Sequence, residues 1–323
     1  MILAGDIGGT KTLLALYEGS RGTLSHVRGE SYRSGDARSL EEILQRFLGI
    51  ASVAPLQGAC FAVAGPVVDG KCKTTNLPWE LDETQLGEAL RTRVRLLNDL
   101  EGAAHGLLSI APDELEVLQP GLKRQGNVAL IAAGTGLGEA ILVRAGDRHH
   151  VIASEGGHAD FAPRSDLETA LLGYLRKAHG HVSYERLLSG PGLHNIYRFL
   201  RDCGHGAEPT WLRERLAAGD PSAVISEAAL SASDPLCAAA LDLFVSIYGA
   251  EAGNLALKSL ALGGVFVAGG IAPKILPKLR NGSFVKGFND KGRLAGLMRS
   301  LEVSVVLNPR MALIGAATVA TDL

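Results

Sequence analysis

The stretch Ile2–Gly19, ILAGDIGGTKTLLALYEG, consists of an apolar run, a Gly-Gly-Thr turn and a second apolar run that ends in glycine. Short apolar runs bounded by glycine are typical of β-strands, so the stretch predicts a hairpin. The same plan returns, with low identity, at Asn127–Gly146, NVALIAAGTGLGEAILVRAG. The repetition predicts an internal duplication into two similar α/β domains, each with a Gly/Thr turn at a hairpin tip.

The segments after the first hairpin alternate between strand and helix patterns. A helix is predicted over Ser39–Leu48, because Ser39 and Glu42 form a capping pair ahead of one apolar stripe. Another helix is expected from about Glu101 to Leu108. The expected strands are Thr23–Arg33, Gly58–Val67 and Val94–Leu100. Elements in this order predict a mixed α/β layer structure.

The second half begins with strands and then becomes helical. His149–Gly157 is expected as a third strand after the second hairpin. Cys237–Leu262 is expected as a long helix that runs into a buried strand within Gly264–Ile271. The Pro- and Gly-containing stretch Ile110–Gly126 is the expected crossover between the two domains.

Composition and charge exclude several classes of function. The chain has 323 residues, a net charge of -2 and scattered Lys and Arg, whereas binding to nucleic acid or a membrane surface needs a concentrated basic patch. No apolar run reaches the roughly 18 residues that span a bilayer, and the N-terminus lacks a signal-peptide pattern. The four cysteines form no CxxC pair and fit reduced thiols. We therefore expect a cytoplasmic protein with no nucleic-acid or membrane partner.

The first Gly/Thr turn shares only some letters with a nucleotide P-loop. A P-loop needs glycine before the lysine and a helix after it, whereas Thr10 precedes Lys11 and a strand pattern follows. A plain hairpin turn uses Gly8 and Gly9 for their backbone freedom, but has no use for Asp6 at the end of a buried strand. A phosphate-bound Mg²⁺ would neutralise Asp6. The sequence therefore favours a turn whose backbone N–H groups bind phosphate.

The second turn, Gly134-Thr135-Gly136, has strand patterns on both sides. A dinucleotide-binding site has GxGxxG and continues into a helix, which disfavours a dinucleotide-dependent oxidoreductase. Paired with the first turn, it predicts two turns that bind one polyphosphate from opposite domains. Gly269 and Gly270, directly after a buried strand, mark a further place where backbone could approach a ligand closely.

Five polar side chains could recognise a polyhydroxylated substrate, because carboxylate, amide and imidazole groups hydrogen-bond to vicinal hydroxyls. They are Asn98, Asp99, Glu155, His158 and Glu185. For Asn98 and Asp99 the motif alone favours a helix cap over an amide beside a general base. The spacing of Glu155 and His158 does not fit a metal-binding helix, and the chain contains no GxSxG elbow or protein-kinase signature.

A series of motifs, in chain order, resembles the bacterial glucokinase family, in the sugar-kinase branch of the actin-like ATPase superfamily. The motifs are DIGGTKT, AGPV, TNLPW, LLNDLEG, AGTGLG, SEGGHADFAPR, YERLLSGPG and AGGI. The resemblance continues to the C-terminal NPRMALIGAA and thus covers nearly the whole chain. It implies two ribonuclease-H-like domains with mixed sheets around a central cleft, at 1–109 with 308–323 and at 110–307.

The resemblance also implies an activity: phosphorylation of glucose at the 6-hydroxyl, with ATP and Mg²⁺, by an enzyme that forms a homodimer. Asp99 is implied as the catalytic base, and Asn98, Asp99, Glu155, His158 and Glu185 as the glucose contacts. Asp6 is implied to hold Mg²⁺, through water. The residues implied to bind ATP are Asp6, Gly8, Gly9, Thr10, Gly134, Thr135, Gly136, Gly269 and Gly270.

Related repressors and kinases often carry a CxCG-type zinc motif after the sugar-site histidine, and this sequence has none there. That difference favours the glucokinase branch. Lys11 receives no role, and Trp79 is expected to anchor a helix start rather than to line the sugar site.

Two alternatives remain open. One is a kinase of the same fold for another hexose or an N-acetylhexosamine, or with another donor such as polyphosphate. The other is a sugar sensor without catalysis or a transcriptional repressor. Related repressors carry an N-terminal helix-turn-helix extension, for which the position of the phosphate turn at Asp6 leaves no room.

Overall fold

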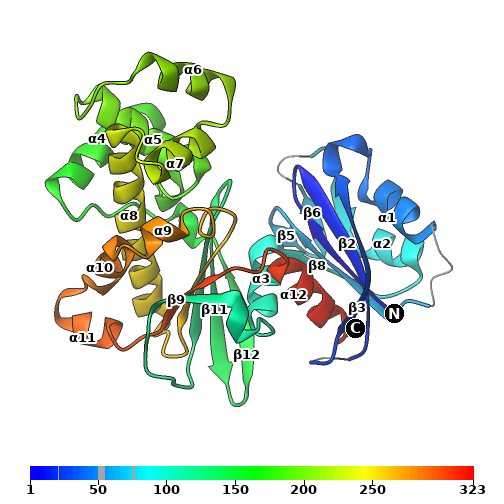
Figure 1. The fold of residues 1–323 in the computed structure, drawn as a ribbon. Helices are drawn as coiled ribbons and strands as arrows, with labels where there is room; N and C mark the ends of the chain where they lie inside the picture. The colour runs from blue at the N-terminus through cyan, green and yellow to red at the C-terminus, as the bar shows by residue number, and fades with distance from the viewer. Residues whose placement is uncertain (21, 50–54, 75–76) are drawn as a thin grey trace. The chain divides into compact units, whose positions relative to one another are not determined.

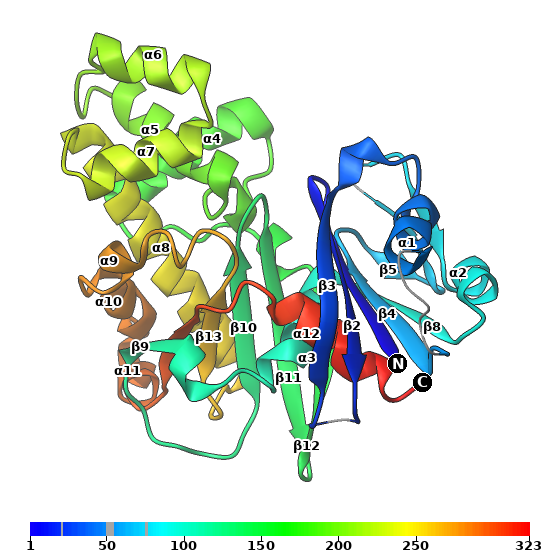
Figure 2. The same cartoon turned by 45° about the vertical axis from the view of Figure 1, so that its right-hand side comes forward.

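The computed structural model describes residues 1–20, 22–49, 55–74 and 77–323. The chain divides into two compact units. Unit 1 is Met1–Pro112 with Asn308–Leu323, and unit 2 is Asp113–Leu307. Figures 1 and 2 show helices and a mixed sheet in each. The expected domain bounds themselves stay a prediction.

Unit 1 is built on a five-stranded sheet of order β3-β2-β1-β4-β8. β1 pairs antiparallel with β2 and parallel with β4, and β4 pairs parallel with β8. The C-terminal ends of β1, β4 and β8 therefore lie at the same edge of the sheet. The strands are β1 (Ile2–Ile7), β2 (Lys11–Glu18), β3 (Ser25–Arg33), β4 (Gly58–Val63) and β8 (Val94–Asn98).

Helices cover both faces of this sheet (Figure 2). On one face, Phe47 of α1 and Leu86 of α2 pack into a core with Leu3 of β1. On the other face, Leu313 of α12 packs with Ile2 of β1. The helices are α1 (Leu40–Gly49), α2 (Glu83–Leu90), α3 (Asp99–Leu107) and α12 (Met311–Ala320), with a 3-10 turn η1 at Ser34–Asp36.

α3 and α12 touch through glycine. A Cβ on Gly106 would collide with the Met311 carbonyl, and a Cβ on Gly315 would collide with the Gly102 carbonyl. Two helix backbones approach this closely only where side chains are absent. The contact fixes α3, whose first residue is Asp99.

A small antiparallel sheet in unit 1 is not predicted by the sequence. Its strands are β5 (Val67–Val68), β6 (Lys71–Lys73) and β7 (Glu80–Asp82). They are too short to show an alternating pattern. Trp79, just before β7, is 2% exposed and packs in the same core as Leu86 of α2, which fits its expected anchoring role. Two residues of the TNLPW motif, 75 and 76, lie outside the described residues.

Unit 2 contains a six-stranded sheet of order β12-β11-β10-β13-β14-β9. Its first five strands repeat the unit 1 sheet: two antiparallel pairings are followed by two parallel ones. This repetition confirms the predicted internal duplication. The strands are β9 (Leu115–Gln119), β10 (Val128–Ala133), β11 (Leu137–Ala145), β12 (Arg148–Ser154), β13 (Val265–Ala268) and β14 (Val303–Val306).

The expected crossover Ile110–Gly126 is more ordered than its composition suggests. It contains a 3-10 turn, η2 (Pro112–Glu114), and β9, which extends the sheet by pairing antiparallel with β14. The chain passes from unit 1 to unit 2 at Pro112 and Asp113. The strand was not predicted because the proline and glycine residues around it are typical of a loop.

The predicted long helix is α8 (Pro235–Ser259), which lies at the centre of unit 2. It begins two residues before the expected start because the Asp234 side chain caps it, accepting from the Cys237 N–H (2.7 Å). It ends before the expected Leu262 because Leu260 adopts a left-handed conformation, φ 46°. Figure 1 shows α5 and α7 against its first half and α10 along its second.

α8 corrects one expectation from the sequence. By length and composition it could cross a membrane, whereas no such run was expected. Within the protein, 72% of its most apolar 18-residue window is buried. An apolar helix surrounded by other elements is the core of a large unit.

Further helices complete unit 2. The α-helices are α4 (Asp166–His179), α5 (Gly190–Asp202), α6 (Thr210–Ala218), α7 (Pro221–Leu230), α9 (Leu276–Leu279), α10 (Ser283–Asn289) and α11 (Ala295–Met298). The 3-10 turns are η3 (Gly156–His158), η4 (Tyr184–Arg186) and η5 (Gly292–Leu294).

Candidate active site

The first glycine turn joins β1 to β2 and is held from behind by Ser34. The buried Ser34 hydroxyl donates to the Gly8 carbonyl (2.7 Å), and the Ser34 N–H donates to the Thr10 carbonyl (3.0 Å). The Gly8 N–H closes the turn onto the Lys11 carbonyl (3.0 Å). In the described part of the chain, the N–H groups of Gly9 and Thr10 have no hydrogen-bond partner. The turn thus presents two donors, as a phosphate-binding turn requires.

Asp6, near the end of β1, lies in an environment that disfavours its charge. Burial and, after it, repulsion from Asp99 raise the pKa of Asp6 to about 6, while the positive charge of Lys11 opposes the shift. The structure therefore places Asp6 and Asp99 within electrostatic reach of one another. It also shows Lys11, to which the sequence analysis assigned no role, as a cation acting on Asp6.

This arrangement fits a magnesium ion that arrives with ATP. Among the described residues no group of three or more His, Cys, Asp or Glu side chains could hold a metal by itself. Mg²⁺ commonly uses one or two carboxylates together with substrate phosphates and water. Asp6 would supply such a carboxylate beside the donors of the first turn, and a cation there would stabilise its charged form.

Asn98 and Asp99 form the start of α3, two residues earlier than expected. The Asn98 Oδ1 accepts from the Leu100 N–H (2.9 Å), which confirms the helix-cap interpretation. Its Nδ2 donates to the Gly65 carbonyl after β4 (3.1 Å). Asp99 is the first helical residue, where the helix dipole favours a negative charge. The amide of Asn98 has two Nδ2 protons, and the bond to Gly65 uses one of them, so the other can donate to a further acceptor.

The residues just described share one edge of the sheet in unit 1. Asp6 lies at the end of β1, Gly65 follows β4, and Asn98 ends β8. In open α/β sheets ligands bind beyond the carboxyl ends of the parallel strands. The topology thus brings the first turn, Asn98 and Asp99 together.

The second glycine turn, between β10 and β11, is held by two groups from one distant segment. The Gly190 N–H, at the start of α5, donates to the Gly134 carbonyl (2.9 Å). The Glu185 carboxylate accepts from the Leu137 N–H (3.0 Å). Gly136 lies directly against the same carboxylate and has no room for a Cβ. Glu185, implied only as a sugar contact, therefore also supports the second glycine turn.

Gly269 and Gly270 lie beside the second turn. Gly269 follows β13 with φ +84° and packs onto the Ala133 carbonyl, where a Cβ would clash. The Ile271 N–H donates to that carbonyl (3.2 Å), and Ala133 is the residue before Gly134. A Cβ on Gly270 would meet open space. The two glycine segments of unit 2 are therefore adjacent, which fits the prediction that both bind ATP.

Glu155 and His158 lie on a turn after β12. The predicted strand His149–Gly157 ends at Ser154, and the 3-10 turn η3 follows. The side chains are 76% and 59% exposed, with the Glu155 Oε2 and His158 Nε2 atoms 3.9 Å apart. Gly157, between them, packs against the Leu137 carbonyl. The turn therefore lies against the end of the second glycine turn, and its polar side chains are exposed to solvent.

Sequence analysis missed Ser34 and underestimated Lys11 and Gly190. Ser34 follows β3 with no motif around it, so only tertiary contact reveals its role. Lys11 belongs to the motif DIGGTKT, and Gly190 belongs to the motif YERLLSGPG. The motifs alone do not show that Lys11 acts on Asp6 or that Gly190 bonds to the second glycine turn.

The fold and these sites define an α/β sugar kinase. A family model described as Glucokinase matches residues 3–323. A glucokinase of Nostoc sp. is 45% identical over 340 residues, covering 100% of this chain and 99% of the relative. The crystal structure of a glucokinase from an Antarctic psychrotroph has a TM-score of 0.88 at 31% identity, covering 100% of this chain and 99% of the other.

A ROK family glucokinase from Streptomyces griseus, solved in complex with glucose and AMPPNP, has a TM-score of 0.65 at 21% identity and covers 100% of this chain and 99% of its own. At that identity the likeness concerns the fold, which is the actin-like ATPase fold of the sugar kinases. The full-length matches decide the family: the chain belongs to the glucokinase family.

Proposed function

We propose that the chain transfers the γ-phosphoryl group of ATP to the 6-hydroxyl of glucose. Family membership supports this proposal, and one structural observation carries it: Asp99 stands at a strand end in the same electrostatic environment as Asp6 and the phosphate-type turn. A positioned carboxylate beside phosphate-binding donors is what a kinase needs to activate a hydroxyl.

Asp99 acts as the general base in this proposal. It accepts the proton of the sugar 6-hydroxyl while that oxygen forms a bond to the γ-phosphorus. The bond from the γ-phosphorus to the bridging oxygen breaks, and ADP leaves. Base catalysis of this kind contributes typically about 10²–10⁴ in rate. Asp99 is the first residue of α3, where the helix dipole favours the negative charge of its carboxylate.

Each glycine turn offers nucleotide-binding groups within its own unit. In unit 1 the N–H groups of Gly9 and Thr10 are donors for phosphate oxygens, and in unit 2 the turn Gly134–Gly136 lies beside Gly269 and Gly270. Magnesium, when bound near Asp6, neutralises phosphate charge. Preorganised turns of this kind supply alignment, which is most of what phosphoryl transfer requires.

Each unit also offers candidate sugar contacts. In unit 1 Asn98 offers an amide proton, and in unit 2 Glu155, His158 and Glu185 offer acceptors and a donor. Amide, carboxylate and imidazole groups of this kind hydrogen-bond to sugar hydroxyls. The proposal further includes a homodimer and the cytoplasm as the compartment; free thiols at all four cysteines support a reducing environment.

A substrate panel tests this proposal. Purified protein is assayed with ATP and Mg²⁺ against glucose, fructose, mannose and N-acetylmannosamine, and glucose is then assayed with polyphosphate in place of ATP. ADP release is followed by a coupled assay. The expected result is the highest kcat/KM for glucose with ATP. Turnover of another sugar alone would redirect the substrate, and no turnover with any sugar would favour a sensor.

A further inference from the structure

Unit 2 contains two buried carboxyl groups that the proposed mechanism does not use, and one of them lies against the Glu155–His158 turn. Glu139 of β11 is 1% exposed and Glu251 of α8 is 0% exposed. Among the described residues, the Glu139 Oε1 atom finds no hydrogen-bond donor. A proton on either carboxyl group would join the two by a hydrogen bond. Buried acids without such a bond are costly, so the pair requires an explanation.

Glu139 supports the Gly156–Gly157 turn directly. Its Oε2 atom occupies the space that a Cβ on Gly156 would need. The Gly156 N–H donates to the hydroxyl of Ser154, which pairs with Glu139 across β11 and β12. The turn between Glu155 and His158 therefore rests on the Glu139 carboxyl group.

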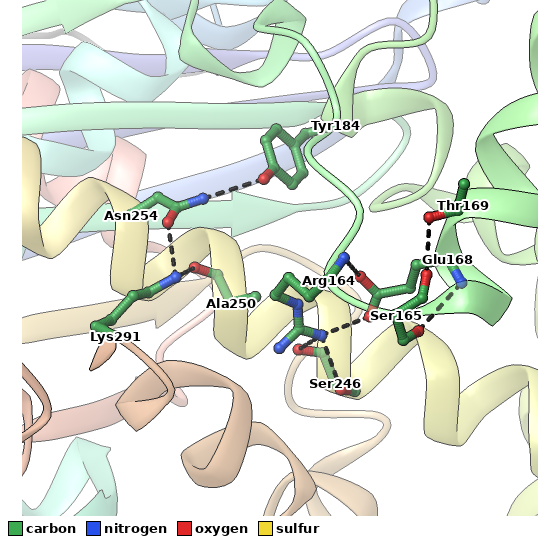
Figure 3. A network of polar contacts seen from close by, with 9 residues as sticks. All are labelled: Arg164, Ser165, Glu168, Thr169, Tyr184, Ser246, Ala250, Asn254 and Lys291. Atoms are coloured by element: carbon green, nitrogen blue, oxygen red, sulfur yellow. Dashed lines mark hydrogen bonds and ion pairs between the residues drawn. The ribbon is translucent and has the colours of Figure 1, made fainter. Parts of the chain in front are cut away.

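Glu251 is linked to the other proposed sugar segment. Its carboxylate accepts from the Asn254 Nδ2 (2.7 Å), which also donates to the Tyr184 hydroxyl (3.0 Å). The Asn254 Oδ1 accepts from the Lys291 Nζ (2.6 Å), as Figure 3 shows. Tyr184 immediately precedes Glu185, and its N–H donates to the Ala159 carbonyl (3.0 Å), just after His158. One network thus reaches both segments.

The geometry points to Glu139 as a positioning residue. We propose that its buried carboxyl group, paired with Glu251, holds the Gly156–Gly157 turn, and with it Glu155 and His158, in the conformation that receives the sugar. The inference rests on the proposed function only for the identity of Glu155 and His158 as sugar contacts. The mechanical link between Glu139 and the turn is independent of any activity.

The charge of Glu139 should decide whether the pair holds. Burial, followed by repulsion from Glu251, raises the pKa of Glu139 to about 8, and the ammonium of Lys258 opposes the shift. Below that pH one proton can bridge the two acids; above it two negative charges face each other. The titratable groups that interact with the pair are Lys258 and Tyr248 on α8, Tyr184 on η4, and Lys291. Asp290 and Arg164 in turn act on Lys291.

Two variants separate these states. Glu139→Gln keeps the shape and a neutral donor toward Glu251, whereas Glu139→Ala removes the support. With wild-type protein, KM for glucose should rise about tenfold between pH 7 and pH 9, the equivalent of about one lost hydrogen bond. Glu139→Gln should show no such rise, and Glu139→Ala should show the high KM already at pH 7. KM for ATP should change much less in all three.

Glu208→Gln provides a matched control. The Glu208 side chain is also buried in unit 2, but its partners are Tyr197 and Arg201 on α5 and Arg213 on α6, outside the turn. It should lower the melting temperature without changing KM for glucose. A merely structural role for Glu139 would give the same result in both variants.

Hydrogen–deuterium exchange of residues 154–161, corrected for intrinsic rate, tests the link without any activity. Protection in wild-type protein should fall between pH 7 and pH 9 and persist in Glu139→Gln. If the exchange changes as expected but the protein phosphorylates no sugar, the positioning role of Glu139 is supported and the proposed function is wrong. Equal protection at both pH values in wild-type protein, with KM for glucose constant, would overturn the proposal even if the variants fail to fold.

Discussion

The two glycine turns occupy equivalent places in the two repeats, yet they are supported differently. The first is held by a neutral hydroxyl, Ser34, and lies among charged groups, Asp6 and Lys11. The second is held by a carboxylate, Glu185, and by the Gly190 N–H at the start of α5. Duplication preserved the sheet, while the residues behind each turn diverged. The first turn thus lies with the proposed phosphoryl-transfer groups, and the second contacts the proposed sugar-binding segments.

Asp99 gives the largest expected effect in unit 1. Asp99→Asn keeps the helix start capped by Asn98 but cannot accept a proton at neutral pH. We expect kcat to fall about 10²–10⁴-fold, with glucose affinity by titration calorimetry largely unchanged. Glu101→Gln, on the same turn of α3, is the control and should retain turnover. Near-normal turnover of Asp99→Asn would remove the base assignment.

Glu185 gives the largest expected effect on the second turn. Glu185→Ala removes the acceptor of the Leu137 N–H as well as a proposed sugar contact. KM for ATP and for glucose should both rise, each by about 10- to 100-fold, because a hydrogen bond to a charged group is worth about 1.5–3 kcal/mol. Glu185→Gln retains an oxygen acceptor and should be milder. Glu227→Ala, at an exposed position, serves as control. A rise in KM for only one of the two substrates would contradict the proposal that Glu185 serves both the second turn and the sugar.

Asp6 should show a conflict between function and stability. The pKa of Asp6 is raised from 3.8 to about 6 in the folded protein. The free energy of unfolding therefore falls as the pH rises from 3.8 to 6, and it stays lower at higher pH, because Asp6 ionises more readily in the unfolded chain. Asp6→Asn should therefore stabilise unit 1 at pH 7 by about 3 kcal/mol, and by little below pH 4, where Asp6 is largely protonated in the folded and the unfolded protein. Wild-type protein should gain more stability from Mg·ATP than the variant does.

Denaturant unfolding at the two pH values measures the effect of Asp6→Asn. Asp69→Asn, at an exposed position of unit 1, is the matched control and should show no difference between pH 4 and pH 7. A variant no more stable than wild type at pH 7 would show that the charge of Asp6 is already neutralised within the protein.

Ser34 gives the smallest expected effect. Ser34→Ala leaves the Gly8 carbonyl without its donor in a buried place, which costs about 1–3 kcal/mol locally. KM for ATP should rise on the order of tenfold, while KM for glucose stays within about twofold. Ser20→Ala, at the exposed opposite end of the hairpin, should change neither. An equal rise of both KM values would erase the distinction between the two turns.

Local patterns were sufficient to predict the hairpins, the duplication and the helices α1, α3 and α8, whereas helices such as α4 and α5 were not predicted. Glycine turns between apolar runs fixed β1, β2, β10 and β11, and the capping pair fixed α1, where the Glu42 N–H donates to the Ser39 hydroxyl (3.4 Å). The Asn98 cap shifted the start of α3, and short strands such as β5 and β9 carry too little pattern to be recognised.

Tertiary support could not be predicted in the same way. Nothing near Ser34 in the sequence points to Gly8, and nothing near Glu139 points to Glu251. Such contacts join residues far apart in the chain, and polar residues in strands or helices look alike whether they are exposed or buried. Motif residues of the candidate site were therefore visible in the sequence, whereas the residues that hold them were not.

The product of the reaction tests the central claim most directly. Purified protein is incubated with ATP, Mg²⁺ and glucose, and phosphorus NMR identifies where the γ-phosphoryl group goes. The account predicts glucose 6-phosphate and ADP in equal amounts, with Asp99→Asn forming both about 10²–10⁴-fold more slowly. Phosphate released to water alone, or a sugar phosphorylated at another oxygen, would contradict the assignment of this site to the 6-hydroxyl of glucose.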